Sequence, residues 1–424
     1  MRHKRVWIGL ILISAVLLLL ASAARAGGYS SGVKLSPIEQ LGKSIFFDED
    51  LSLNKNQSCA TCHAPEVGWV GPDSAINQGG AVYEGSIAGR FGDRRPPVSA
   101  YATLSPIFHL TRKGLFVGGN FWDGRATGKK LGNPAADQAQ GPFLNPVEQA
   151  LPDSACVVYR VCMASYPVSL ENVWGSTACD ITWPVDVEAA CAAPGSPVSL
   201  ATADRATSDA AYDAIALAIA AYEDSDEVNA FSSKYDLSRG PRAVKLTQLE
   251  QRGYALFRGK GMCHRCHTSN GQGALFTDFT YDNLGLPQNP DNPAGLSFVD
   301  PGLGGFLKNA GYPEAVYMAE WGKHKVPTLR NVGLRPNTAV VKAYGHNGYF
   351  KSLEGIVHFY NTRDVKPTCP GPYTEAQALA ANCWPAPEVS ANVNTAELGD
   401  LGLTSAEERA IVAFLKTLSD GYQR

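Results

Sequence analysis

Two stretches of the chain share one pattern of polar and apolar positions. Residues 36–46 and 247–257 each begin with Ser or Thr, carry Glu three residues later, and then place apolar side chains at helical spacing. A hydroxyl residue followed by Glu at this distance is a capping box, in which the two side chains satisfy free amide groups at the start of a helix. Gly42 and Gly253 occupy the same position in the two copies. The pattern predicts one short amphipathic helix in each half of the chain.

A cysteine motif follows each predicted helix. The sequence Cys-x-x-Cys-His occurs at residues 59–63 and again at residues 263–267. Because one unit of helix and motif is used twice, we expect two similar domains. The helical pattern that precedes the second copy gives way to Asp, Ser, Arg and Pro between Ala230 and Pro241, which marks the predicted boundary.

We expect an N-terminal domain over residues 27–235 and a C-terminal domain over residues 236–424. Residues 150–205, which carry four cysteines and scattered Pro and Ser, form a predicted insertion in the first domain. A third capping box and an apolar stripe predict a closing helix within residues 404–418. Alternating strand patterns are few, so the predicted fold is mainly α with long irregular connections.

The first 26 residues have the pattern of a cleaved secretory signal. Basic residues precede an apolar run from Val6 to Ala21, and small residues at Ala24 and Ala26 supply a cleavage site. The run is shorter than the ~20 residues that span a bilayer. An uncleaved membrane anchor is the alternative. We expect export to the periplasm and a mature chain that begins near Gly27 and has no membrane span.

The balance of charged residues in the mature chain argues against one class of partner. Cleavage removes four basic and no acidic residues, so 33 Lys and Arg oppose 40 Asp and Glu in the mature chain. No cluster of Lys or Arg remains to neutralise phosphates. A nucleic-acid partner is therefore not expected.

Six of the ten cysteines lie outside the two motifs, in Pro-rich irregular stretches. An exported chain permits disulfides, so we predict up to three of them. Their connectivity does not follow from the sequence, and pairing between sequence neighbours is the simplest hypothesis. These cysteines are Cys156, Cys162, Cys179, Cys191, Cys369 and Cys383.

Cys-x-x-Cys-His is the attachment sequence for c-type haem. Two thiols at this spacing reach the two vinyl groups of one porphyrin, and the adjacent His binds iron. A structural zinc site would need four ligands, and a thioredoxin-like pair would need neither the His nor the repeat. We therefore predict two covalent haems in two cytochrome-c-like domains. The predicted attachment residues are Cys59, Cys62 and His63 for the first haem, and Cys263, Cys266 and His267 for the second.

The sixth ligand of each iron decides its role. A strong sixth ligand favours electron transfer, whereas an open position lets iron bind a small oxidant. No His or Met occurs between Ala64 and Phe108, so we expect the first haem to be open. His109 is the alternative ligand, and it would have to fold back across the site.

Seven short blocks, in this order around the two motifs, resemble the bacterial di-haem cytochrome c peroxidases and their MauG-type relatives. The resemblance covers nearly the whole mature chain. The blocks are Leu-Gly-Lys to Phe-Phe-Asp at residues 41–48, Phe-Trp-Asp-Gly-Arg-Ala at 121–126, Gly-Pro at 141–142, Asn-Pro-Val-Glu at 145–148, Lys-Val-Pro-Thr-Leu-Arg-Asn at 325–331, His-Asn-Gly at 346–348 and Phe-Tyr-Asn at 359–361.

The resemblance implies roles around the first haem. Glu148 matches the family's distal acid, which takes a proton from peroxide and returns it to the leaving oxygen. Gln138 matches a polar residue of the distal pocket, and Pro142 matches a residue of its wall. Trp122 matches the tryptophan between the two haems, where an aromatic ring can relay an electron. Without the family pattern, a helix cap and an ordinary core residue would be the simpler interpretations of Glu148 and Trp122.

For the second haem, the resemblance places the distal ligand at Tyr360. Classical peroxidases of the family carry Met there, and MauG-type members carry Tyr. A thioether raises the potential of iron, whereas a phenolate stabilises its oxidised states. Tyr360 also shares a helix face with apolar residues, so packing is the alternative role. Met163 and Met318 are competing ligands that match no ligand position of the family.

One departure concerns calcium. Where many members have an Asn that contributes to a calcium site between the domains, this chain has Arg95. That weakens the inference of calcium, although carbonyl groups near Ala343 and water are suitable oxygen ligands. His346 matches a family residue near the second haem.

The resemblance implies a periplasmic peroxidase. It would reduce hydrogen peroxide with electrons from a small c-type cytochrome or cupredoxin. A MauG-type oxidase that modifies Trp or Tyr of a partner protein is one alternative, favoured by Tyr360. A non-catalytic electron-transfer cytochrome is another, and it would require two ligands on both irons.

Overall fold

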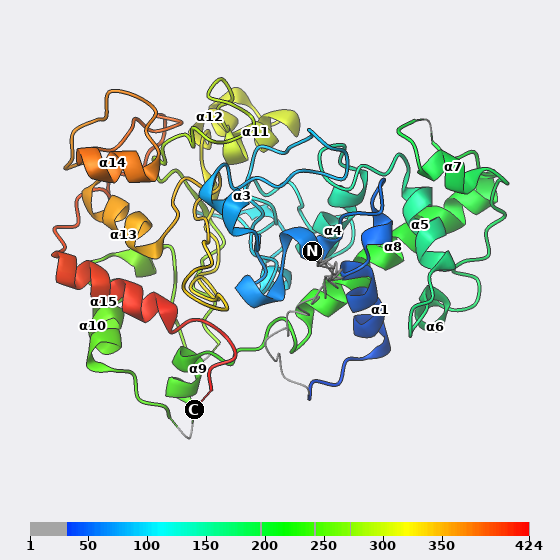
Figure 1. Cartoon of the computed structure of the whole chain (residues 1–424), viewed down its shortest axis with the longest axis horizontal. Helices are drawn as coiled ribbons and strands as arrows, with labels where there is room; N and C mark the ends of the chain where they lie inside the picture. The colour runs from blue at the N-terminus through cyan, green and yellow to red at the C-terminus, as the bar shows by residue number, and fades with distance from the viewer. Residues whose placement is uncertain (1–31, 196, 241–242, 272, 424) are drawn as a thin grey trace, which may run out of the picture.

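The structure is a computed structural model that describes residues 32–195, 197–240, 243–271 and 273–423. It is helix-rich, with fifteen α-helices and only four two-residue strands in this part of the chain (Figure 1). The predicted signal peptide, residues 1–26, lies outside the described residues. Every helix in the described part is too short or too polar to cross a bilayer.

The helices are α1 (Pro37–Phe46), α2 (Cys59–Cys62), α3 (Ser74–Gln78), α4 (Pro134–Leu144), α5 (Ser154–Met163), α6 (Leu170–Trp174), α7 (Val187–Cys191), α8 (Thr202–Asp224), α9 (Lys234–Arg239), α10 (Gln248–Arg258), α11 (Gly302–Asn309), α12 (Glu314–Ala319), α13 (Leu353–Thr362), α14 (Glu375–Ala381) and α15 (Ser405–Lys416). The strands form two antiparallel pairs, β1 (His109–Leu110) with β2 (Phe116–Val117) and β3 (Tyr281–Asp282) with β4 (His324–Lys325).

The three predicted capping boxes are present at the starts of α1, α10 and α15. At α10, for example, the Thr247 hydroxyl accepts from the backbone N–H of Glu250, and the Glu250 carboxylate accepts from the N–H of Thr247 at 2.7 Å. The amphipathic helices predicted from residues 36–46 and 247–257 are therefore confirmed.

The repeated glycines permit two equivalent helix crossings. In the first half α1 packs on α8, and in the second half α10 packs on α15, at opposite ends of the molecule (Figure 1). A Cβ atom at Gly42 would lie 1.9 Å from the carbonyl oxygen of Ala218, and one at Gly253 would lie 1.9 Å from that of Ala410. Only a residue without a side chain allows this approach.

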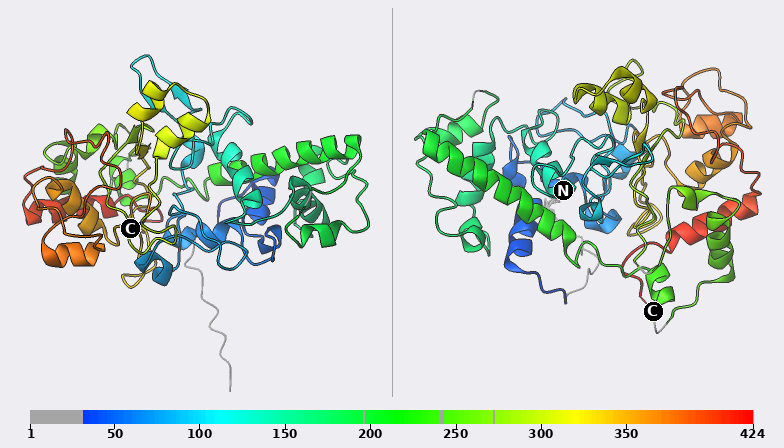
Figure 2. Two further views of the ribbon diagram at one scale, coloured as in Figure 1. Left: turned by 90° about the horizontal axis from the view of Figure 1, so that it is seen from above. Right: turned by 180° about the vertical axis from the view of Figure 1, so that it is seen from behind.

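The two largest hydrophobic cores of the described residues lie in different halves of the chain, while a smaller cluster packs Phe108 and Phe116 against Tyr281, Leu303 and Leu307. One is built by buried residues from Leu41 to Val228 and includes α1, α5 and α8. The other is built by buried residues from Tyr235 to Leu418 and includes α10, α13 and α15. The change from one core to the other lies between Val228 and Tyr235, which overlaps the predicted boundary region, and Figure 2 shows the two halves side by side.

The six remaining cysteines form three disulfides, as predicted. Cys369 pairs with its sequence neighbour Cys383. In the predicted insertion, however, the bond between Cys156 and Cys191 encloses the bond between Cys162 and Cys179. Cys162 and Cys179 are consecutive cysteines and so agree with pairing between sequence neighbours, but the Cys156–Cys191 bond does not, because α5 carries Cys156 and Cys162 on one rigid helix and Cys156 bonds to a more distant cysteine.

Candidate active site

The first motif forms a short helix that presents its residues to a cavity. The α2 helix contains Cys59 and Cys62 and ends at His63, whose N–H donates to the carbonyl of Cys59 at 3.0 Å. All three side chains line one cavity of about 1110 Å³, measured out to open solvent. The two cysteines are not in disulfides, so their thiols are free to react.

The His63 ring has a fixed orientation. Its Nδ1 lies 3.4 Å from the carbonyl oxygen of Trp69. Burial lowers the pKa of His63 to about 4, against the opposing effect of the Trp69 and Pro97 carbonyls, so the ring is neutral. A neutral imidazole whose Nδ1 faces a carbonyl presents Nε2 as a metal ligand.

The acidic and polar residues predicted for this site lie in the same cavity. Glu148, Gln138 and Pro142 line it together with His63. Gln138 and Pro142 belong to α4, and Pro142 has no N–H to donate to the Gln138 carbonyl four residues earlier. The backbone of Glu148 is held by hydrogen bonds with Asn145 and Ser86.

The Glu148 carboxyl has an environment suited to proton transfer. Burial raises its pKa, while the charge of Arg125 and a hydrogen bond from Asn145 oppose this rise. A carboxyl whose pKa is raised by burial holds a proton more readily than a free one, which suits it to general acid–base work. The structure therefore brings the predicted acid to the cavity of the first motif.

Trp122 lies where the two halves meet. It is 6% exposed, and its indole N–H donates to the Arg95 carbonyl at 2.8 Å. Its own carbonyl accepts from the backbone N–H of Lys325, which belongs to the second half. It lines the cavities of both motifs.

The second motif repeats the geometry of the first. The N–H of His267 donates to the carbonyl of Cys263 at 2.9 Å, and His267 Nδ1 lies 2.9 Å from the carbonyl oxygen of Phe276. Cys263, Cys266 and His267 line a cavity of about 1610 Å³, measured out to open solvent. Tyr360, on α13, lines the same cavity.

The competing ligands lie elsewhere. Met163 is 60% exposed and Met318 is 44% exposed, and neither lines the cavity of the second motif. Met262 does line it, but its place directly before Cys263 puts it beside the attachment residues. His109 is exposed on β1, with Nδ1 2.8 Å from the Ile107 carbonyl, and lines neither cavity.

The structure adds one residue that the sequence pattern does not single out. Glu223, on α8, is 3% exposed and lines the first cavity beside Glu148. Its Oε2 atom has no hydrogen-bond partner among the described residues. Burial raises the pKa of Glu223 to about 8. Glu223 fits the ordinary helical pattern of α8, so its place in the cavity is evident only from the fold.

Comparison with known proteins decides the family. The di-haem cytochrome c peroxidase model matches residues 36–240. The chain is 37% identical to the methylamine utilization protein MauG of Paracoccus denitrificans, over 90% of this chain and 88% of MauG. It is 26% identical to the cytochrome c551 peroxidase of Nitrosomonas europaea, over 80% of this chain and 79% of that protein. The chain belongs to the di-haem cytochrome c peroxidase and MauG family.

A solved relative supports the same assignment. The diheme peroxidase BthA of Burkholderia thailandensis is 30% identical and superposes with a TM-score of 0.70, covering 92% of this chain and 89% of BthA. Membership of a di-haem family implies two haem groups and an oxidoreductase. The residues fit this cofactor, because each cavity brings together two free thiols and one imidazole whose pKa is lowered by burial and whose Nδ1 faces a backbone carbonyl.

The residues fit calcium poorly. Calcium requires six to eight oxygen ligands. At the position where family members supply an Asn oxygen, Arg95 supplies a guanidinium, which carries only donors and a positive charge. We therefore assign no role to calcium in this chain.

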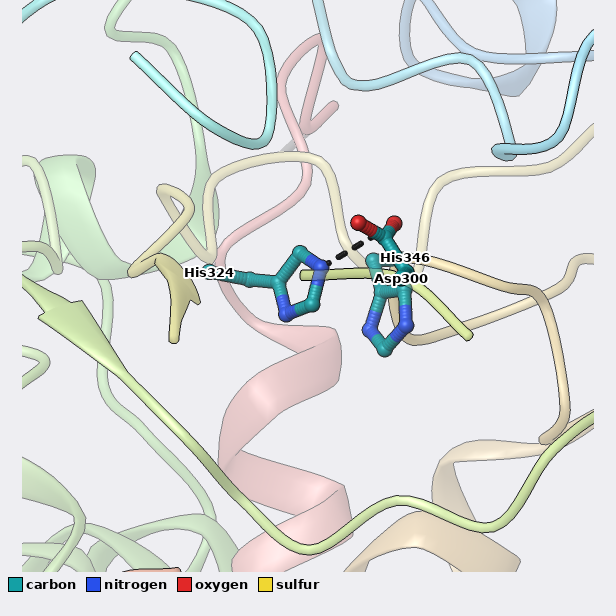
Figure 3. A group of neighbouring side chains, drawn as sticks. All are labelled: Asp300, His324 and His346. Atoms are coloured by element: carbon teal, nitrogen blue, oxygen red, sulfur yellow. Dashed lines mark ion pairs between the residues drawn. The ribbon is translucent and has the colours of Figure 1, made fainter. Parts of the chain in front are cut away.

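A second candidate metal cluster is also excluded by its geometry. Asp300, His324 and His346 lie together between the halves (Figure 3). Both carboxylate oxygens of Asp300 already accept from Arg94, at 2.6 and 2.7 Å. One ligand atom of each residue lies within 4.8 Å of the others, but the two imidazoles stack at 3.6 Å with 6° between their planes, so one ion cannot lie in the plane of both rings. With Asp123, which also pairs with Arg94, the group forms a polar link between the halves.

Proposed function

We propose that this chain is a periplasmic di-haem c-type peroxidase that reduces hydrogen peroxide to water. The observation that supports this most is the shared cavity of His63, Glu148 and Gln138, beside Trp122. The proposal includes covalent attachment of one haem through Cys59 and Cys62 and of the other through Cys263 and Cys266. It also includes two cytochrome-c-like domains, which the two separate cores support.

The reaction consumes two electrons and two protons for each peroxide and yields two water molecules. Bound haem supplies the iron position for peroxide and passes the electrons. Glu148 accepts a proton from hydrogen peroxide and returns it to the departing oxygen, and Gln138 orients the peroxide by hydrogen bonding.

Electrons reach the first cavity from the second half of the chain. His267 and Tyr360 line the second cavity and are the proposed ligands of its iron. Trp122 lies between the cavities and is the proposed relay. The proposed donor is a small c-type cytochrome or a cupredoxin in the periplasm, where the predicted signal peptide directs the chain.

A MauG-type oxidase is the second candidate function. Two observations favour it: Tyr360 lines the second cavity, and MauG of Paracoccus denitrificans is 37% identical over most of both chains. In that case the electrons come from Trp or Tyr of a partner protein, which is thereby modified. A plain electron-transfer cytochrome is disfavoured, because the described lining of the first cavity contains one His and no Met.

A turnover assay distinguishes these functions. The holoprotein is mixed with hydrogen peroxide and a reduced small c-type cytochrome or cupredoxin, and oxidation of the donor is followed by absorbance. We expect rapid, peroxide-dependent oxidation. Inertness toward every donor, together with a modified protein encoded by a neighbouring gene, would assign the MauG-type function instead. Inertness with neither partner would contradict an enzymatic role.

A further inference from the structure

Arg95 is a partly buried cation that makes no hydrogen bond with a carboxylate of the described residues. Its Nε donates to the Gly345 carbonyl at 3.0 Å, and its guanidinium lies 5.4 Å from the ring centre of Trp122. Burial lowers the pKa of Arg95 to about 10, and the only groups that oppose this are the tyrosines Tyr83 and Tyr344. The guanidinium is thus charged and incompletely paired within the protein.

The preceding residue provides an internal comparison. Arg94 donates to Asp300 through two nitrogens, at 2.6 and 2.7 Å, and to Asp123 at 2.6 Å. Burying an ion costs several kcal/mol unless a counter-charge and hydrogen bonds replace its water. Arg94 has that replacement within the chain. Arg95 has backbone carbonyl and aromatic contacts instead, so its guanidinium is left without a hydrogen-bonded counter-charge in the polypeptide and is available to one from a bound group.

Arg95 lies where the cofactors are expected. It lines the cavity of the first motif and the cavity of the second. A second buried cation, Lys342, also lines the second cavity, and its Nζ donates only to the backbone carbonyls of Val67, Asn331 and Leu334. Burial, reinforced by repulsion from Arg95, lowers the pKa of Lys342. Asp282, Asp300, Glu388 and Glu397 also line this cavity, but Arg95 and Lys342 donate to backbone carbonyls and not to these carboxyl groups, so an anionic occupant is favoured beside them.

Haem carries two carboxylates on the edge opposite its vinyl groups. Attachment of the vinyl groups at Cys263 and Cys266 therefore turns the carboxylates away from these cysteines. The wall that the first half of the chain contributes to the second cavity contains Arg95 and Trp122 and no cysteine. A guanidinium matches a carboxylate in both charge and planar geometry, whereas a metal cation would be repelled.

We propose that Arg95 binds a haem carboxylate between the two cavities. The fixed positive charge of its side chain replaces the charge that calcium provides there elsewhere in the family. The proposal rests on the proposed function only in requiring two haems. Because a nearby positive charge destabilises the more positive ferric iron, Arg95 raises the reduction potential of the haem it contacts.

The test compares Arg95→Gln with Arg90→Gln, a matched change at an exposed arginine five residues earlier. The haem content of each holoprotein is measured first, by the pyridine haemochrome method. Reduction potentials of both haems are then measured by spectroelectrochemistry. For Arg95→Gln we expect two haems and a ferrous-to-ferric ratio lowered about tenfold for one of them, which corresponds to about 59 mV. The haem whose potential falls identifies the carboxylate that Arg95 binds.

Potentials in Arg95→Gln that match those of Arg90→Gln would overturn the proposal. A wild-type protein without two haems would instead contradict the proposed function. If Arg95→Gln does not fold, Arg95→Lys is used instead, because it keeps the charge but loses the bidentate geometry. Resonance Raman spectra of this variant then test whether residue 95 contacts a haem carboxylate. A shifted propionate bending band in that variant supports the proposal, and an unshifted band overturns it.

The calcium content of the protein provides an independent test of the proposal. Wild-type holoprotein is treated with EGTA, and its metal content and potentials are measured before and after. We expect no stoichiometric calcium and unchanged potentials. One tightly held calcium ion, whose removal shifts a haem potential, would overturn the assignment of this charge to Arg95.

Discussion

In the first half of the molecule α1 crosses α8 at Gly42, and in the second half α10 crosses α15 at Gly253. Both crossings bring an aromatic residue against the glycine, Tyr222 in one and Phe414 in the other. Both halves also turn the Nδ1 atom of the motif histidine toward a backbone carbonyl. The attachment side of the two sites is therefore a structural repeat.

The residues of α8 and α15 that line the two cavities are alike at one position and differ at the next. Ile219 lines the first cavity as Ile411 lines the second. One turn later, the first half has the buried acid Glu223 where the second half has Leu415. The first cavity thus contains the buried Glu223 together with the half-buried Glu148, whereas at the position that matches Glu223 the second cavity has the apolar Leu415.

This difference shows how duplication can yield two functions. The repeated helices and motif supply the same attachment geometry to both halves. Carboxyl groups line both cavities, but Glu148 and Glu223 lie in the cavity that contains no second His or Met among its described lining residues, whereas the other cavity contains the potential metal ligand Tyr360. The account therefore assigns peroxide chemistry to the first site and electron storage to the second.

The largest effect is expected at Glu148. Glu148→Gln keeps the shape of the side chain but cannot exchange a proton, so we expect cleavage of peroxide to slow by roughly 10²- to 10⁴-fold with both haems retained. Peroxide consumption measured by stopped flow checks this, with Glu171→Gln on the exposed α6 as the control. Consumption at the wild-type rate would remove Glu148 from the mechanism.

Replacing Glu223 by the residue of the other half, in Glu223→Leu, should stabilise the protein above pH 5. The unfolded side chain loses its proton near pH 4.5, whereas the folded one keeps it to about pH 8. Wild-type stability therefore falls as pH rises through this window, and we expect the variant to gain about 2–4 kcal/mol at pH 8.

Urea unfolding of the holoproteins at pH 5 and pH 8 measures this difference. Asp209→Asn, at an exposed position of the same helix, is the control. A gain that is the same at both pH values would show that Glu223 titrates alike in the folded and unfolded states.

The second site is tested by Tyr360→Met. If Tyr360 binds iron as a phenolate, a thioether in its place should raise the potential of the second haem by about 0.1 V, within the ≈ 0.8 V that axial ligands span. Spectroelectrochemistry measures the shift, and Tyr422→Met at an exposed site is the control. An unchanged potential would make Tyr360 a packing residue.

The smallest effects should be alike in the two halves. Gly42→Ala and Gly253→Ala each place a methyl group against a backbone carbonyl, so each should cost about 1–3 kcal/mol of stability. Gly371→Ala, where a Cβ meets nothing closer than 3.9 Å, should be neutral. Urea unfolding checks all three, and sensitivity at only one crossing would contradict the structural repeat.

The sequence was sufficient for the local features of this molecule. Capping boxes, the helices they begin and the two motifs depend on residues within a few positions of each other, so their pattern predicts them directly. The family resemblance predicted that Glu148, Gln138 and Trp122 lie near the first haem, and the fold places them around one cavity.

Features that depend on contacts between distant residues were not predictable in the same way. The approach of Gly42 to Ala218 and the cavity position of Glu223 arise only when α1 and α8 pack. The nested disulfides of the insertion depend on how α5 and α7 meet, and the cysteine spacing carries no information on that.

The most direct test of the account is the spin state of the oxidised enzyme. The diferric holoprotein is examined by electron paramagnetic resonance and then mixed with peroxide in a stopped-flow instrument, without prior reduction. Since the first cavity offers His63 but no second His or Met among its described lining residues, we expect one high-spin haem, one low-spin haem and immediate reaction. Two low-spin signals, with no reaction until an electron is added, would contradict the account.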